Sequence, residues 1–210
     1  NIENSRFAAL VINDYLGKAG YRRSPSALLE TVFPALTASG DCLAFNAGHA
    51  ATGLDPNVGT GFCIRYQPQI SGELDCQGAA SPVVYDVAFP SLPPDESDLT
   101  VLAFKYEPGS GGELQDGRLL CKSLNANSPQ YGEVLRGIAD LRLDFGVGST
   151  GMLEKQITTF ISQADADDSK VFADWLADAS ADTKTRLEEA DNRRIYQMAA
   201  ATQTIRNLMP

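Results

Sequence analysis

The sequence predicts an α+β fold in which an N-terminal helix packs on antiparallel β-sheet. Three observations lead to this prediction: apolar residues at helical spacing over 2–19, short alternating runs between turn residues over 40–147, and helix-favouring composition over 152–192. With 210 residues, of which 43% are hydrophobic, the chain can bury one ordinary core. We therefore expect a single domain over 1–210.

The first element is a helix expected within 1–20. Two neighbouring rows at spacings of four residues give it a broad apolar side: Phe7, Val11 and Tyr15, and Ala8, Ile12 and Leu16. Polar residues, among them Asn13 and Lys18, lie elsewhere on the helix. Gly20 readily adopts the left-handed conformation that ends many helices, so we expect the helix to end just before it.

The middle of the chain is typical of a β-rich body. Six runs are candidate strands: 43–46, 62–67, 83–89, 99–106, 119–122 and 141–145. Phe62, Ile64 and Tyr66 occupy every second position, which is the period of a half-buried strand. Turn sequences at 109–112 and 116–117 suit hairpins, so short antiparallel strands are favoured over βαβ units.

The C-terminal part is predicted to be mainly helical. Within 152–192, four residues share one helical face: Phe172, Trp175, Leu176 and Ala179. The acidic stretch 165–168 suits a helix N-terminus but lacks the glycine and distal glutamate of an EF-hand, so no calcium loop is expected. The last segment, 193–209, fits a helical period and also contains residues that suit a strand. Its pattern alone leans towards helix.

The four cysteines, Cys42, Cys63, Cys76 and Cys121, favour two disulfides and an oxidising compartment. Their spacings do not match a zinc site, and the single histidine, His49, leaves a His/Cys metal site short of ligands. Of the three possible pairings we prefer Cys42–Cys63 with Cys76–Cys121, because each pair lies within or near a plausible strand pair. Free thiols in a cytosolic protein are the alternative.

The charge balance and the missing apolar run limit the possible partners. The chain has 27 acidic and 17 basic residues, a net charge of −10, which opposes direct contact with nucleic acid or anionic lipid. It contains no run of 18 apolar residues and no signal sequence. Because Asn1 already lies in a helical pattern, we expect a fragment trimmed upstream.

A search for catalytic motifs finds no supported site. A hydrolase would have to use His49, which lies in a glycine-flanked stretch typical of a loop, and no serine has a Gly-x-Ser-x-Gly context. The glycines at 146, 148 and 151 resemble part of a dinucleotide motif, but no βαβ unit supports it. We expect no catalytic residue, cofactor or metal.

Three segments, in order along the chain, resemble the minor pilins of the type IV pilus, of the PilW type. Residues 3–8 (E-N-S-R-F-A) and 19–22 (A-G-Y-R) are similar to the family's E-N-x-R-F-A … A-G-Y-R stretch after the membrane-embedded half of the pilin helix. Residues 132–147 resemble its V-E-G-V-E-D-L-x-V-x-Y-G-V strand, and 193–207 its closing R-R … T-T-V-x-L-R-N strand. In this order they are spread over most of the chain, from residue 3 to residue 207.

The resemblance implies a type IV pilin-like fold and a structural role. It implies a closing strand over 194–208, and a helix resting on the sheet through Phe7, Val11, Ile12, Tyr15 and Leu16. An apolar upstream helix with a methylated N-terminus would hold the protein in the bacterial inner membrane, with this domain in the periplasm, before it enters the extracellular pilus. The expected role is to prime assembly at or near the tip, in support of motility and DNA uptake. Other minor pilins, the major pilin and a tip adhesin are the expected partners, and no direct contact with nucleic acid is expected.

The chain departs from the family near Trp175, where the family usually continues into a strand and 176–190 here favour a helix. We interpret the helical insertion at 152–192 as a partner-binding or shielding feature. Two other interpretations stay open. One is a J-type pseudopilin of the type II secretion system, and the other is a periplasmic ligand-binding or adhesive domain that uses loops at 46–61 and 107–118.

Overall fold

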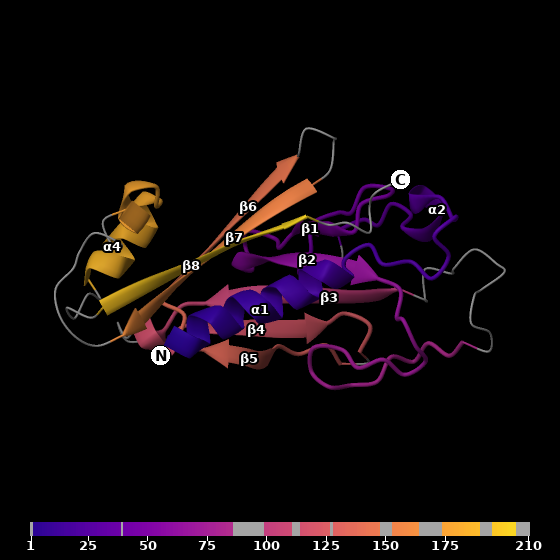
Figure 1. Cartoon of the computed structure of the whole chain (residues 1–210), viewed down its shortest axis with the longest axis horizontal. Coiled ribbons are helices and arrows are strands. Elements are labelled where there is room, and N and C mark those ends of the chain that lie inside the picture. Colours follow the sequence, from indigo (N-terminus) through magenta and orange to yellow (C-terminus); the bar gives the residue numbers. More distant parts are fainter. Residues whose placement is uncertain are drawn as a thin grey trace.

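The computed structural model has an α+β fold in which helix α1 lies along a five-stranded antiparallel sheet, and a three-stranded antiparallel sheet crosses beside it (Figure 1). The structure describes residues 2–38, 40–85, 99–110, 114–126, 128–147, 153–163, 174–189 and 195–204. The predicted fold class, an N-terminal helix on antiparallel sheet, is confirmed.

Helix α1 (Ile2–Lys18) ends where the sequence predicts. Gly20 has a φ of 74°, in the left-handed region, and its N–H donates to the carbonyl oxygen of Arg65 at 3.0 Å. The chain therefore turns off the helix and joins the sheet at one residue. A short helix, α2 (Leu29–Val32), follows.

The five strands of the first sheet pair antiparallel in chain order. They are β1 (Ala51–Gly53), β2 (Thr60–Tyr66), β3 (Thr100–Glu107), β4 (Arg118–Ser123) and β5 (Gly132–Arg136). A 3₁₀ turn, η3 (Leu114–Asp116), precedes β4. The runs predicted at 62–67, 99–106 and 119–122 correspond to β2, β3 and β4.

Two predicted strands are wrong over their described residues. The run 43–46 forms no strand, because its N–H groups do not pair with one partner strand. The N–H of Leu43 donates to the carbonyl of Gly53, whereas the N–H of Phe45 donates to the carbonyl of Leu36. Residues 83–85 are also not a strand, and 86–89 lie outside the described residues.

The second sheet has the order β6-β7-β8, and its strands are β6 (Asp140–Val147), β7 (Leu153–Gln163) and β8 (Ile195–Thr204). Strand β8 falls within the closing strand that the resemblance implies. The prediction of a helix from 152 onwards is wrong, because β7 is the central strand of this sheet. Its run Ile157-Thr158-Thr159-Phe160-Ile161 is rich in β-branched residues, and pairing on both edges satisfies its backbone.

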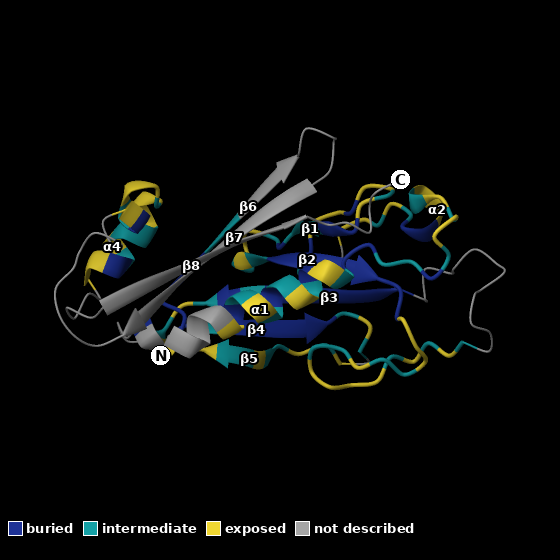
Figure 2. Cartoon of the chain, viewed as in Figure 1, coloured by how far each residue is buried: buried dark blue, intermediate teal, exposed yellow. Residues whose placement is uncertain are grey.

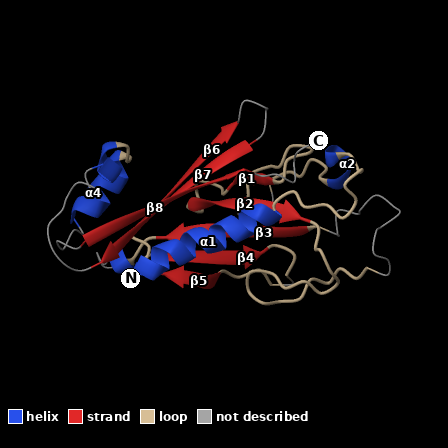
Figure 3. Ribbon diagram, in the orientation of Figure 1, coloured by secondary structure: helices blue, strands red, loops and turns tan. Residues whose placement is uncertain are grey.

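The helical part of the insertion is shorter than predicted. Residues 174–177 are helical, and α4 (Ala181–Glu189) follows. The hydroxyl of Ser180 caps α4 by accepting a hydrogen bond from the N–H of Thr183 at 3.3 Å. Figure 3 shows this helical part set apart from both sheets, at the end of the molecule where α1 begins.

The two faces of the five-stranded sheet are covered differently. One face packs under α1, and the strands there are almost entirely buried (Figure 2). On the other face, Cys63, Val101 and Ala103 pack against Cys42, Phe45 and Leu54 from the segment that precedes β2. The sheet is therefore the middle layer between a helix and an irregular segment.

Arg65 of β2 organises that irregular segment. Its side chain is buried, with only 1% of the residue exposed, and it donates hydrogen bonds of 2.6–3.1 Å to the backbone carbonyls of Phe33, Pro34, Asn46 and His49. Its guanidinium lies 4.7 Å from the centroid of the Phe45 ring. One cation thus satisfies the carbonyls of two loop stretches that lack regular secondary structure.

Replacing Arg65 by Met should destabilise the protein by about 3 kcal/mol, because four carbonyls, one in a buried and three in part-buried hydrogen bonds, would lose their donor. Urea unfolding with the disulfides intact measures this change. Arg136→Met removes an exposed arginine and is the matched control, with stability expected near the wild type. Equal midpoints for the two variants would contradict this role of Arg65.

Candidate assembly interface

Helix α1 buries one narrow row of side chains. Ala8, Ile12 and Leu16 of the helix, and Ala19 directly after its end, are all 0% exposed. They pack on the inner residues of three strands: Phe62, Ile64, Tyr66, Leu102, Phe104, Tyr106, Leu119 and Cys121. Burial of a side chain such as Ile12 or Leu16 contributes about 1.5–3 kcal/mol. This row fixes which side of α1 faces away from the sheet.

The opposite side of α1 carries an outward row of Phe7, Leu10, Asp14 and Gly17, all exposed. Their spacing of three and four residues places them on one face of the helix. Phe7 is 52% exposed and Leu10 is 66% exposed, so two large apolar side chains face solvent within one turn. Adjacent exposed apolar side chains of this kind are typical of protein–protein contacts.

The predicted packing row was too wide. Ile12 and Leu16 are buried, whereas Val11 and Tyr15 are half-buried at the border of the contact. Phe7 does not pack on the sheet as predicted, because the buried stripe runs through Ala8, whose small side chain allows a close approach. Leu10 was not singled out from the sequence, although its spacing of three from Phe7 was visible there.

The border of α1 is fixed by aromatic and ionic contacts. The Tyr15 ring lies 5.0 Å from the Phe104 ring, centroid to centroid. The ammonium of Lys18 lies 3.0 Å from a carboxylate oxygen of Glu73 and 5.9 Å from the centroid of the Tyr66 ring. Burial raises the pKa of Tyr66, so its hydroxyl stays protonated at neutral pH. These contacts hold the outward row in one orientation.

Two disulfides, Cys42–Cys63 and Cys76–Cys121, join irregular segments to the sheet, and they are the pairs preferred from the sequence. Cys63 lies in β2 and Cys121 in β4, and both are fully buried. Each bridge therefore ties one irregular segment to a central strand, one on either face of the sheet. Such bridges restrict the unfolded chain and suit an oxidising environment.

An ion pair next to the first disulfide fastens the same segment. Lys122 of β4 donates to the carboxylate of Asp41, and its ammonium lies 4.6 Å from the centroid of the Tyr131 ring. Burial by itself would raise the pKa of Asp41, but the hydrogen bond and the positive charge of Lys122 help to outweigh burial and hold that pKa below its usual value. The ionised carboxylate is thus the bound form.

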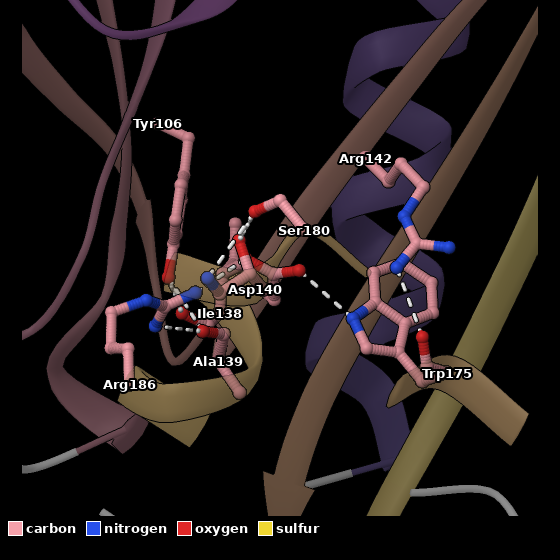
Figure 4. Close-up of polar contacts among 9 residues, drawn as sticks. Tyr106, Ile138, Ala139, Asp140, Arg142, Trp175, Ser180 and Arg186 are labelled. Atoms are coloured by element: carbon pink, nitrogen blue, oxygen red, sulfur yellow. Dashed lines mark hydrogen bonds and ion pairs between the residues drawn. The ribbon is translucent and has the colours of Figure 1, made fainter. Parts of the chain in front are cut away.

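The insertion is attached to the start of β6 by a polar cluster of Asp140, Trp175 and Arg186 (Figure 4). The Trp175 indole N–H donates to Asp140 Oδ2 at 2.8 Å, and Arg186 Nη2 donates to Asp140 Oδ1 at 2.5 Å. Arg186 also donates to the carbonyl of Ala139, as does the buried hydroxyl of Tyr106. Sequence analysis placed Trp175 on an apolar face but missed Asp140, because the two are 35 positions apart.

The residues considered for chemistry are used structurally. His49 is exposed in a loop, and its backbone carbonyl accepts a hydrogen bond from Arg65. A cavity of about 450 Å³ lies beside the 107–118 loop, where Arg118 forms ion pairs with Glu107 and Glu133. Within the described ranges, no group of three or more His, Cys, Asp or Glu side chains is arranged to hold a metal.

Some sequence predictions fall outside the described residues: the acidic stretch 165–168, Phe172 of the predicted helical face, and the glycines at 148 and 151. Across the described part of the chain, no helix has both the length and the apolar character needed to cross a membrane.

Comparison with known proteins gives one structural likeness. No protein-family model and no curated protein matches the chain. Among solved structures, a type IV-like pilin from Thermus thermophilus aligns with 99% of this chain and 98% of its own, at 12% sequence identity and a TM-score of 0.46. A TM-score this low does not establish a family for the chain.

Arg186→Met should loosen the insertion, because Asp140 would lose its guanidinium partner. Trp175 is the chain's only tryptophan and is 3% exposed, so its emission should shift to longer wavelength and its quenching by acrylamide should increase. Stability should fall by about 2 kcal/mol. Glu188→Gln, an exposed change on the same helix, is the control. Unchanged Trp175 emission in Arg186→Met would contradict the role assigned to the pair.

Asp41→Asn should make the free energy of unfolding fall less steeply as the pH is lowered into the acid range. The pKa of Asp41 in the folded protein lies below its unfolded value of about 3.9. The Asp41–Lys122 pair therefore stabilises the fold fully above the unfolded pKa, and this stabilisation is lost as the pH falls through the folded pKa. Chemical denaturation between about pH 5 and pH 2 measures the slope. Asp178→Asn removes an exposed carboxylate and serves as the matched control. A slope for Asp41→Asn as steep as the wild type would show that the pair does not carry the effect.

Proposed function

We propose that this protein is a minor pilin, a non-enzymatic structural subunit that primes assembly of the type IV pilus at or near its tip. The observation that carries the proposal is the two-sided helix α1, which buries the row of Ala8, Ile12, Leu16 and Ala19 on a sheet and leaves Phe7 and Leu10 exposed. The sequence segments that resemble minor pilins begin on this helix and end on β8, the closing strand of the second sheet.

The exposed apolar side of α1 supports an assembly role. Two adjacent large apolar side chains cost free energy while they face water, and contact with another subunit would remove that cost. The contacts of Tyr15 and Lys18 already hold helix α1 on the sheet, so the backbone that carries these side chains need not be ordered on association. Helices of other minor pilins and of the major pilin are the proposed neighbours, and a tip adhesin is a further proposed partner.

The disulfides and the insertion support the same proposal. Both irregular segments are fastened covalently, which suits a periplasmic and then extracellular subunit that is anchored in the inner membrane before assembly. Helix α4 lies at the end of the molecule where α1 begins (Figure 1). We propose that the insertion contacts or shields neighbouring subunits at this end of the molecule.

The test is complementation of the source bacterium after deletion of the gene, with surface pili counted by electron microscopy. Phe7→Asp and Leu10→Asp in the full-length protein should each reduce pili at least tenfold, because a charge would have to be buried between subunits. Asp14→Asn, on the same outward row, is the control and should assemble normally. All three variants should unfold at the wild-type temperature, because these side chains lie outside the core.

The same strains separate the alternatives. Normal pili in the deletion strain, with loss of protein secretion, would assign the protein to a secretion pseudopilus and overturn the proposal. Normal pili with Phe7→Asp and Leu10→Asp would show that α1 does not contact neighbours through its outward row.

A further inference from the structure

The loop 70–85 is folded back on itself like a hairpin. Leu74 and Ala80 form an antiparallel bridge, and the N–H of Ser81 donates to the carbonyl of Glu73 at 2.8 Å. At the tip, the carboxylate of Asp75 accepts hydrogen bonds from the N–H groups of Gln77 and Ala79. Around this bridge alternate residues therefore point to opposite sides, as they do in a strand pair, whereas Ile70 begins a turn whose Glu73 N–H donates to its carbonyl at 3.2 Å.

This hairpin and the turn before it carry an exposed apolar surface. We call it the apolar loop face, and it consists of Ile70, Leu74, Ala80, Pro82 and Val84, all exposed. Ile70 is 67% exposed, Leu74 is 58% exposed and Val84 is 72% exposed, so no part of the described chain covers them. Glu73 and Ser81, which form the neighbouring backbone pair, are half-buried on the other side.

The apolar loop face is held in place by contacts at the tip of the hairpin and along one arm. The Cys76–Cys121 disulfide ties the tip to β4, and Gln77 Nε2 donates to the carbonyls of Cys121 and Gln130 at 2.8 and 2.6 Å. The Glu73 carboxylate is fixed by Lys18 of α1. The loop is thus linked to the sheet and to the helix, so binding there would cost little ordering entropy.

The size and charge of this face indicate what binds it. Three large and two small side chains cannot supply the ~800 Å² per partner that a stable complex buries, so a partner must also be held elsewhere. A second copy of this chain is disfavoured, because each copy carries a net charge of −10. The partner that fits these conditions is a different, less acidic subunit of the same assembly, which α1 contacts at the same time.

We infer that the apolar loop face docks against an apolar patch on a neighbouring, non-identical pilus subunit, in addition to the contact through α1. This inference rests on the proposed function. The loop acts as a second, weak contact that selects which subunit lies next to this one, because contact through α1 alone uses only two large apolar side chains.

The test places a photo-crosslinking amino acid at Val84 in the full-length protein, in piliated cells, and identifies the adducts by mass spectrometry. The expected adduct is with a different pilus subunit, and its yield should fall at least fivefold when Leu74→Asp is also present. The same crosslinker at Asn57, which is exposed outside the loop, is the matched control and should not give this adduct. Leu74→Asp should leave Trp175 emission and the unfolding temperature unchanged, because Leu74 is 58% exposed.

The outcomes separate the loop inference from the proposed function. Adducts only with a second copy of this chain, only with lipid, or with no protein would overturn the inference. If these results occur while Phe7→Asp still abolishes pili, the loop inference fails and the minor-pilin proposal stands. If deletion of the gene leaves pili intact, both fail.

Discussion

The structure depends on the burial of one narrow row of α1 on the five-stranded sheet. Ala8 and Ala19 let the helix approach closely, and Ile12 and Leu16 fill the space above Phe62 and Phe104. A helix has only one stripe that can be buried in this way, so placing this row inward leaves Phe7 and Leu10 outward. The rotation of the helix thus determines both the core of the domain and the surface that it offers to other proteins.

Among the described residues, the cover of the other face of the sheet is irregular chain around Cys42, Phe45 and Leu54. Such a cover needs partners for its carbonyl groups and a restraint on its entropy. Arg65 supplies the first through hydrogen bonds to two loop stretches, and the Cys42–Cys63 disulfide with the Asp41–Lys122 pair supplies the second. The rigid support under α1 therefore relies on charged and covalent contacts as well as on apolar packing.

The insertion and the 70–85 loop follow the same plan. Each is an added segment that is fastened to a sheet. The insertion is held by the contact of Arg186 with Asp140, and the 70–85 loop is held by the Cys76–Cys121 disulfide. The insertion buries Trp175 and Leu187, whereas the loop leaves three large apolar side chains exposed. The loop therefore offers an apolar surface to a partner, whereas the described large apolar side chains of the insertion are turned inward and its proposed role rests on its position in the molecule.

The sequence by itself determined the helix at the N-terminus, most of the first sheet and the preferred cysteine pairs, because local periodicity and cysteine spacing carry those features. It placed β7 wrongly, since Leu153–Gln163 is a strand only through pairing with β6 and β8, which are distant in the chain. Only the tertiary structure decided that Phe7 faces outward, that Asp140 meets Arg186, and that Ile70 and Val84 are exposed. These depend on helix rotation and on contacts between residues far apart in sequence, which a local pattern does not encode.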